Sequence, residues 1–322
     1  MQIPVIDIAP FASGDRQAAQ EVAQAWNDAF STVGFAAVAG HGIAPELLDG
    51  IYAQAMRFFE RPAAEKNRFD FPDRGRGQGY LPMGRETVGA GRDPAAQPDL
   101  CESLTFANPR FDTAAPDGAW DARLYAPNLW PDDMPGFRET VEAYIAAGRA
   151  LALELMRLSA AALGLADAHF TPFFDRMELN LRCVLYPDQP EPPPQGALRY
   201  APHTDFSGFT ILRQDAAPGG LQVKTEDGWI DVPSVPGTLV INAGDLIRRW
   251  TNDRWRSNLH RVVNPPRDRT MGTRRLSVVL FTGPNSDAEI TCLPGCGVAG
   301  YPPILAGLHS EERMRQTYGQ MP

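Results

Sequence analysis

RYAPHTDFSGFTILRQD, residues 199–215, places two candidate metal ligands directly before a β-strand pattern. His203 and Asp205 stand two residues apart, and residues i and i+2 of an extended segment point to the same face. Thr204, between them, points away. One imidazole and one carboxylate can therefore approach a common point. Alone the pair is a weak signal, because a His-x-Asp pattern more often forms only a surface hydrogen bond.

A second histidine strengthens this interpretation. His260, in SNLHRVVNPP, opens another β-branched run, and the segment 206–259 has room for four strands. Two imidazoles and one carboxylate leave open metal positions, as is typical of non-haem iron(II) oxygenases. A zinc hydrolase also uses such ligands, but it needs a carboxylate base, and no His-Glu-x-x-His motif supplies one here. Iron is therefore favoured over zinc at the predicted metal and catalytic residues His203, Asp205 and His260.

The second half of the chain is dominated by strand signals. After about Met177, short alternating or β-branched runs are separated by Pro, Gly, Asn and Asp turns, without a helix pattern between them. This predicts a β-sandwich or barrel. The runs are LNLRCVLYP, FTILRQD, LQVKT, WIDVP, TLVINAGD, HRVVN and RRLSVVLF.

The first half mixes helices and strands. A short strand, IPVID, precedes an amphipathic helix that ends at Gly34, and FAAVAG follows as a buried strand. The strongest helix pattern of the chain begins at PGFRETVEAY and ends at Gly164. A final helix is expected within YPPILAGLHSEERMRQTYG.

A candidate carboxylate clamp lies on two of the predicted strands. Arg275 and Ser277 share a face of RRLSVVLF, and a guanidinium pairs bidentately with a carboxylate. A strand taken to run parallel to it, LRCVLYP, places Arg182, Val184 and Tyr186 on one face, so that the Tyr186 phenol can reach the same cavity. Considered alone, Arg275 is equally well an exposed strand residue and Tyr186 a core residue.

The segment 68–92 is rich in glycine and basic residues and lacks periodicity, which predicts a long loop. Long loops in compact enzymes often serve as lids or binding loops. Arg74, Arg76, Arg85 and Arg92 are candidates to meet an anionic substrate, although such arginines are more often only solvated.

Composition limits the partners of the protein. The 322 residues include 30 Lys and Arg against 39 Asp and Glu, a net charge of -9, and the basic residues are scattered. This argues against nucleic acid or an anionic membrane surface as the main partner. No secretory signal and no run of about 18 apolar residues is present, so a cytoplasmic location is expected. The four cysteines are expected to be reduced thiols, including the pair in CLPGC.

The order HTD, GD, TN, HRV and R-x-S resembles the iron(II) and 2-oxoglutarate-dependent dioxygenases of the isopenicillin N synthase-like class. The resemblance extends over nearly the whole chain. Its blocks are IPVIDIAPF, GF and HGI within GFAAVAGHGI, QGYLP, LWPDD, LYP, APHTDFSGFTILRQD, GGLQV, WIDVP, PGTLVINAGD, TNDRWRSNLHRVV and RRLSVVLF.

The resemblance implies an α+β fold whose core is a double-stranded β-helix, a distorted cupin-like jelly roll, flanked by helices. It implies that the triad binds iron(II), that Arg275 and Ser277 bind the distal carboxylate of 2-oxoglutarate, and that Tyr186 assists. O2 is the second co-substrate, and ascorbate a supporting reductant. Many relatives carry an asparagine two residues before that tyrosine, where this chain has Val184, so one co-substrate contact is missing.

The same resemblance divides the chain into four regions. Residues 1–115 form an N-terminal mixed α/β region and residues 116–175 a scaffold-helix region. The iron(II) and 2-oxoglutarate jelly-roll core spans 176–285, and a C-terminal tail, 286–322, packs on it.

The implied activity is oxidation of a small organic molecule by hydroxylation, desaturation or ring closure, with decarboxylation of 2-oxoglutarate to succinate. Phe206, Phe209, Leu221 and Phe281 are candidate walls of the pocket. An oxidase that uses no 2-oxoglutarate, with the Arg-Ser pair holding a substrate carboxylate, remains an alternative. So does an ethylene-forming enzyme, and a metal-free jelly-roll binding protein is least favoured.

Overall fold

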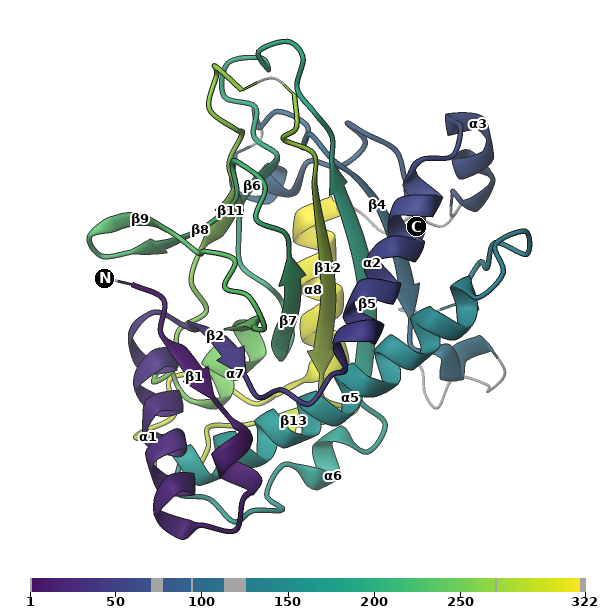
Figure 1. The fold of residues 1–322 in the computed structure, drawn as a ribbon. Helices are drawn as coiled ribbons and strands as arrows, with labels where there is room; N and C mark the ends of the chain where they lie inside the picture. The colour runs from purple at the N-terminus through teal and green to yellow at the C-terminus, as the bar shows by residue number, and fades with distance from the viewer. Residues whose placement is uncertain (1, 71–77, 94, 113–125, 270, 319–322) are drawn as a thin grey trace.

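A computed structural model describes residues 2–70, 78–93, 95–112, 126–269 and 271–318 (Figure 1). Two facing β-sheets form the centre of the molecule. The main sheet has eight strands in the order β1-β2-β10-β7-β12-β5-β4-β3, and the minor sheet four in the order β6-β11-β8-β9. This confirms the predicted double-stranded β-helix with flanking helices. A short third sheet pairs β13 (Glu289–Ile290) with β14 (Ile304–Leu305).

The strands of the main sheet are β1 (Val5–Asp7), β2 (Phe35–Ala39), β10 (Leu239–Ala243), β7 (Phe209–Gln214), β12 (Arg275–Gly283), β5 (Glu178–Tyr186), β4 (Glu102–Ala107) and β3 (Gly79–Leu81). Those of the minor sheet are β6 (Tyr200–His203), β11 (His260–Val262), β8 (Leu221–Thr225) and β9 (Gly228–Asp231). β1 and β2 pair in parallel, and the remaining strand pairs of the described chain are antiparallel.

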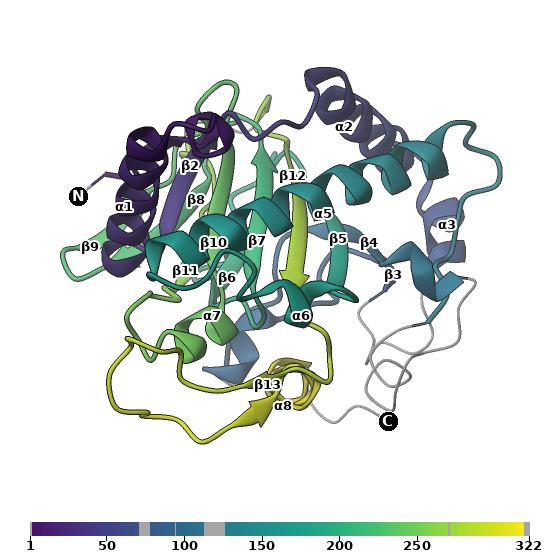
Figure 2. The same cartoon turned by 90° about the horizontal axis from the view of Figure 1, so that it is seen from below.

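Helices cover one face of the main sheet and leave the other face to the cavity. The covering helices are α1 (Arg16–Thr32), α2 (Pro45–Phe59) and α5 (Phe137–Ala162). Figure 2 shows them along one side of the sheet, with α8 (Ala306–Tyr318) on the opposite side. Shorter helices are α3 (Ala63–Lys66), α6 (Thr171–Phe174) and α7 (Asp245–Trp250). In the part of the chain that is described, no helix combines the length and the apolar character needed to cross a membrane.

The helix layer is joined to the sheet by close packing. Trp26 of α1 donates from Nε1 to the Ser159 hydroxyl of α5 at 3.1 Å, which ties the two helices together. At Gly148 of α5, a Cβ atom would lie 2.2 Å from Cδ2 of Leu280 on β12, so glycine allows the helix to approach the strand. A helical glycine costs about 1 kcal/mol relative to alanine. Here that cost permits contact with the strand that carries Arg275 and Ser277.

The turn between α1 and β2 shows why the first predicted helix ends at glycine. Asp15 caps the start of α1 by accepting from the backbone N–H groups of Gln17 and Ala18. Gly34 has φ +71°, and a Cβ there would lie 2.2 Å from the carbonyl oxygen of Arg256. Only glycine fits both the left-handed backbone and this contact.

Two expectations about the secondary structure of the second half of the chain were wrong. The strand containing Tyr186 is not parallel to β12 but antiparallel to it, with Arg275 opposite Tyr186 and Ser277 opposite Val184. The second half of the chain does contain a helix between its strands, because α7 separates β10 from β11. α7 has six residues, too few for a 3.6-residue period to show, and it is stabilised by burial of Leu246, Ile247 and Trp250.

The arginines of the segment 68–92 are not gathered at the cavity in the described part of the chain. Arg85 and Arg92 are exposed, whereas Arg74 and Arg76 lie outside the described residues. Buried residues of this segment include Glu86 and Val88, and Val88 lines the cavity. The four cysteines are free, as expected.

Candidate metal and co-substrate site

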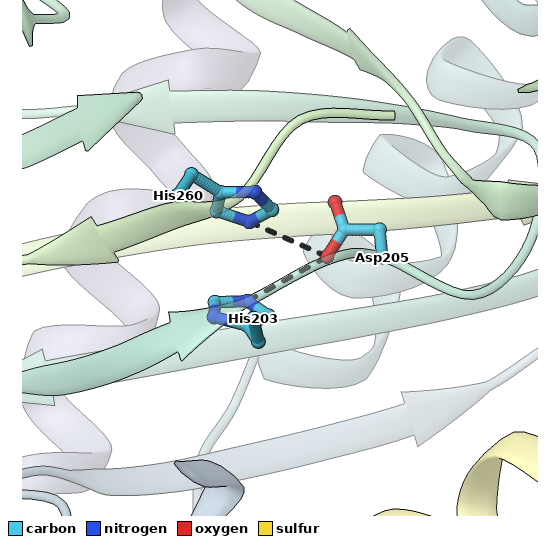
Figure 3. Close-up of side chains that lie close together, drawn as sticks. All are labelled: His203, Asp205 and His260. Carbon is cyan, nitrogen blue, oxygen red and sulfur yellow. Dashed lines mark ion pairs between the residues drawn. The ribbon is translucent and has the colours of Figure 1, made fainter. Parts of the chain in front are cut away.

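The three predicted metal ligands meet at the edge of the minor sheet. Nε2 of His203 lies 3.7 Å from Oδ1 of Asp205, and Nε2 of His260 lies 3.5 Å from the same oxygen (Figure 3). One ligand atom from each residue falls within 4.8 Å of the others. The two histidines face each other because β6 and β11 pair with His203 opposite His260. The predicted triad is thus a single cluster.

Backbone carbonyls orient both imidazoles. Nδ1 of His203 lies 2.9 Å from the carbonyl oxygen of Ala201, and Nδ1 of His260 lies 3.2 Å from that of Asn258. A carbonyl oxygen only accepts, so each Nδ1 carries the hydrogen and each Nε2 presents a lone pair. Metal-binding histidines are commonly fixed in this way.

The carboxylate of Asp205 is held through its second oxygen. Oδ2 accepts from the Thr210 hydroxyl at 2.5 Å and from Nδ2 of Asn242 at 2.7 Å. Oδ1 is thereby directed toward the two Nε2 atoms. Thr210 and Asn242 were not singled out from the sequence, because their contact with Asp205 depends on the pairing of β7 with β10.

The electrostatics of the triad suit a cation. Burial, followed by the charge of His260, lowers the pKa of His203 to about 3. Burial also opposes ionisation of His260 and of Asp205, but their mutual attraction raises the pKa of His260 and lowers that of Asp205. The positive charge that Asp205 favours beside it could equally be that of a divalent metal bound at the two Nε2 lone pairs. Two neutral imidazoles and one carboxylate with open positions fit iron(II).

A cavity of about 210 Å³ opens from the triad between the two sheets and α8. Because side chains alternate along a strand, β5 and β12 each contribute every second residue to its wall. From β5 these are Glu178, Asn180, Arg182, Val184 and Tyr186, and from β12 Arg275, Ser277, Val279 and Phe281. The predicted clamp residues therefore share one cavity with the triad.

The Arg275 guanidinium is held in place inside the cavity wall. It is 2% exposed, and burial lowers its pKa. Nη1 donates to the carbonyl oxygen of Asp215 at 2.8 Å, and Nη2 donates to Oε1 of Gln214 at 2.5 Å. Nε has no hydrogen-bond partner among the described residues. The described hydrogen-bond partners of this buried cation are thus a carbonyl and an amide, not a carboxylate. Its positive charge is therefore available to bind an anion in the cavity.

The remaining clamp residues lie beside this guanidinium. Ser277 is 3% exposed and faces Val184 across the β5–β12 pair. Tyr186 is buried opposite Arg275, and burial raises the pKa of its phenol. Val184 presents only methyl groups at the position where relatives carry an asparagine.

Three of the four predicted pocket walls line the cavity, namely Phe206, Leu221 and Phe281. Phe209 does not. It points to the helix side of β7, where its ring lies 5.5 Å from that of Trp26 and 5.2 Å from that of Phe30. Both faces of FTILRQ are largely buried, so the alternation of this strand did not reveal which face meets the cavity.

Arg182 and α8 add features that the sequence did not reveal. Arg182 forms an ion pair with Glu86, donates to Oγ of Ser103 at 3.0 Å and donates to the Tyr200 hydroxyl at 3.0 Å. Helix α8 contributes Ser310 and Met314 to the cavity wall. Their position depends on how the tail folds back, and no local pattern signals it.

Comparisons with known proteins agree with this geometry. Residues 177–284 match the model of the 2OG-Fe(II) oxygenase superfamily, and residues 3–133 match that of the non-haem dioxygenase in morphine synthesis N-terminal region. The chain is 33% identical over 310 residues to validamycin A dioxygenase of Streptomyces hygroscopicus subsp. limoneus, covering 95% of this chain and 84% of that protein.

Solved structures give the same result. A full-length Neurospora crassa protein, solved in complex with alpha-KG and thymine, has a TM-score of 0.85 and 33% identity, covering 98% of this chain and 97% of that one. A 2OG-Fe(II) oxygenase family protein from Caulobacter crescentus has a TM-score of 0.83 and 29% identity, covering 98% of each chain. The chain therefore belongs to the 2OG-Fe(II) oxygenase superfamily and is an iron(II)- and 2-oxoglutarate-dependent dioxygenase that oxidises a small organic molecule.

Proposed function

We propose that His203, Asp205 and His260 ligate the iron(II) of this dioxygenase. The observation that carries the proposal is the convergence of two Nε2 atoms and one carboxylate oxygen within 4.8 Å, at the wall of the cavity. The groups behind them support it, because each imidazole has its tautomer fixed and the carboxylate has its second oxygen occupied.

Arg275 and Ser277 bind the distal carboxylate of 2-oxoglutarate, and Tyr186 lies beside them. The buried guanidinium supplies the charge, and the serine hydroxyl supplies a further donor. The apolar side chains of Val184, Leu212 and Leu221 line this part of the cavity and exclude water from the co-substrate.

Iron(II), when bound, supplies the redox chemistry that couples the two oxidations. In the hydroxylation form, 2-oxoglutarate, O2 and a C–H substrate yield succinate, CO2 and the alcohol. One oxygen atom enters succinate and the other enters the product. The protein contributes binding, orientation and exclusion of water, so the substrate hydrogen that faces the triad is the one removed.

Product analysis with 2-oxoglutarate, iron(II) and O2 tests this assignment. We expect succinate and CO2 in equal amounts, stimulated by the true substrate, with ascorbate prolonging turnover. A panel of candidate substrates would begin with thymine, because the similar Neurospora crassa protein was solved in complex with it. Ethylene formed from 2-oxoglutarate would support the ethylene-forming alternative, and O2 uptake without 2-oxoglutarate would support the oxidase.

Several predictions from composition and resemblance accompany this proposal. They are a cytoplasmic location, the absence of nucleic-acid and membrane partners, and the division at residues 115, 175 and 285. The substrate class and the type of oxidation are addressed by the panel described above.

A further inference from the structure

One row of residues runs across the main sheet from the triad to the far wall of the cavity. Thr210 of β7, which holds the Asp205 carboxylate, is in register with Phe281 of β12, and Phe281 is in register with Asn180 of β5. Neighbouring strands are about 4.8 Å apart, so Asn180 lies about 10 Å from Thr210, with Phe281 between them. A molecule with one ring spans such a distance.

This row is separate from the co-substrate clamp. Along β12, Ser277 precedes Phe281 by four residues, which is about 14 Å of extended chain. 2-Oxoglutarate at Arg275 and Ser277 therefore leaves the row of Phe281 and Asn180 for the substrate. Helix α8 lies at this end, because Met314 lines the cavity and packs against Ala107, which pairs with Asn180. Ser310, one turn earlier in α8, lines the cavity as well.

Two polar atoms in this end of the cavity are buried without a hydrogen-bond partner among the described residues. They are Oδ1 of Asn180 and Oγ of Ser310. Buried polar atoms in native proteins nearly always have a partner, and leaving one unpaired is costly. Both atoms belong to residues of the cavity wall, so rotation of the amide or of the hydroxyl can turn them toward a group bound in the cavity.

The charges around these atoms select the kind of group. Glu178 precedes Asn180 by two residues on the same face of β5 and adds a carboxylate to the wall. The guanidinium of the same face, Arg182, is paired with Glu86. Apart from Arg275, the described lining therefore has no arginine or lysine available to pair with a substrate carboxylate, because Arg182 is already paired with Glu86. The lining offers instead the Glu178 carboxylate and the Asn180 amide oxygen, which accept hydrogen bonds, and the Ser310 hydroxyl, which can donate or accept.

We infer that Asn180 and Ser310 anchor the polar end of the substrate, and that this end is a neutral or cationic N–H or O–H donor group rather than a carboxylate. Phe281 packs against the apolar part, between the anchor and the triad. The inference rests on the proposed function, because it assigns the substrate half of the same site. It departs from the expectation that arginines of the segment 68–92 meet an anionic substrate.

Three probes on one scaffold test this selectivity: phenylacetamide, phenethylamine and phenylacetate. Their ring suits the wall formed by Phe206, Phe281 and Met314. Binding is measured by calorimetry on the full chain loaded with zinc(II) and 2-oxoglutarate, which does not turn over. We expect the amide and the amine to bind at least about tenfold more tightly than the carboxylate.

Variants of Asn180 and Ser310 test whether these two residues cause the selectivity among the probes. Asn180→Leu should weaken phenylacetamide roughly tenfold, Ser310→Ala should weaken it less, and Asn180→Asp should strengthen phenethylamine. Asn67→Leu and Asn67→Asp change an exposed asparagine and serve as matched controls. Binding of 2-oxoglutarate to each variant, measured in the same way, shows that the variant is folded.

Preferential binding of phenylacetate overturns the inference. Equal affinities for the three probes, or no binding by any of them, also overturn it. The same holds if the Asn180→Leu variant binds the probes with the affinity of the unaltered protein. The proposed function fails separately, if 2-oxoglutarate itself does not bind the zinc-loaded protein.

Discussion

At the scale of single residues, each side chain of the triad is oriented by a hydrogen-bond partner outside the triad. The imidazoles are aimed by carbonyls two residues earlier in the chain, whereas the carboxylate is aimed by side chains from two other strands. The first arrangement is local and the second depends on strand register. The convergence of the three triad residues was predictable from the i, i+2 spacing and the strand signal at His260, but the contacts of Thr210 and Asn242 with Asp205 were not.

Removing one orienting group should weaken the metal site without removing a ligand. Asn242→Ala removes one of the two hydrogen bonds that hold Oδ2 of Asp205, so the carboxylate can rotate away from the two Nε2 atoms more easily. We expect iron(II) affinity to fall about 10–100-fold, measured by competition with a chelator. Asn67→Ala, at an exposed asparagine, should leave the affinity unchanged. Equal affinities in the two variants would contradict this role for Asn242.

Arg275 provides a second test at this scale. Arg275→Lys keeps the positive charge but loses the planar fork that reaches Gln214 and the Asp215 carbonyl and that, in the proposed site, also meets the co-substrate. Hydrogen bonds to charged groups contribute about 1.5–3 kcal/mol, so the KM for 2-oxoglutarate should rise roughly 10–100-fold in a succinate assay. An unchanged KM would show that the co-substrate carboxylate binds elsewhere.

At the scale of elements, β6 is positioned by a buried carboxylate that lies outside it. Asp99 accepts from the backbone N–H of Ala201 and from that of Val88, each at 2.8 Å. The carbonyl of Ala201 in turn accepts from His203. Asp99 thus joins the segment 88–91 to the strand that carries a metal ligand. Burial, opposed in part by these two bonds, raises its pKa to about 7.

This pKa makes the stability of the fold depend on pH in a defined direction. In the unfolded chain Asp99 titrates near its ordinary value of 3.8, so folding raises its pKa. Its favourable contribution to the free energy of unfolding is complete below about pH 4 and is lost as pH rises through 7. The stability of the wild type relative to Asp99→Asn should fall by up to roughly 4 kcal/mol between pH 4 and pH 8, measured by urea unfolding. A difference that is constant or grows with pH would contradict this.

Arg313 links helix α8 to the site. The Arg313 guanidinium lies 4.9 Å from the centre of the Phe206 ring, donates to the Thr204 hydroxyl at 3.1 Å and forms an ion pair with Asp245 at 3.2 Å. Asp245 is buried, so the loss of its partner leaves a buried carboxylate without this cation.

Arg313→Ala should therefore loosen the helix that closes the cavity. We expect a loss of about 1–3 kcal/mol in local stability, seen as faster hydrogen exchange in α8 with α5 unchanged. Arg315→Ala, which removes a more exposed pair with Glu311 on the same helix, should change exchange by less than about 0.5 kcal/mol. Equal effects of the two variants would show that Arg313 does not anchor α8.

The elements themselves divide into those with a strong local pattern and those without one. β5, β7 and β12 have alternating or β-branched runs bounded by turn residues, and α1 and α5 have long amphipathic periods, so all five were predicted. α7 is too short to show a period. The face of β7 was ambiguous because residues on both sides of it are buried, which is why Phe209 was misplaced.

At the scale of the whole molecule, the site depends on two layers that come from distant parts of the chain. The main sheet is covered by α1, α2 and α5 on one face, so its other face is free to form the cavity with the minor sheet and α8 (Figure 2). The jelly-roll class followed from the strand pattern and the resemblance. The contributions of Glu86 and α8 to the site did not, because they arise from packing between segments that are far apart in sequence.

In the proposed site, one cavity binds iron(II) and 2-oxoglutarate together at His203, Asp205, His260 and Arg275. The most direct test of this is anaerobic addition of iron(II) and 2-oxoglutarate to the purified protein, followed by air. A weak visible charge-transfer band that needs both additions, with succinate released in air, is the predicted result, and His203→Ala should give neither signal. Bound iron without the band or succinate, or iron-dependent turnover retained by His203→Ala, would contradict it.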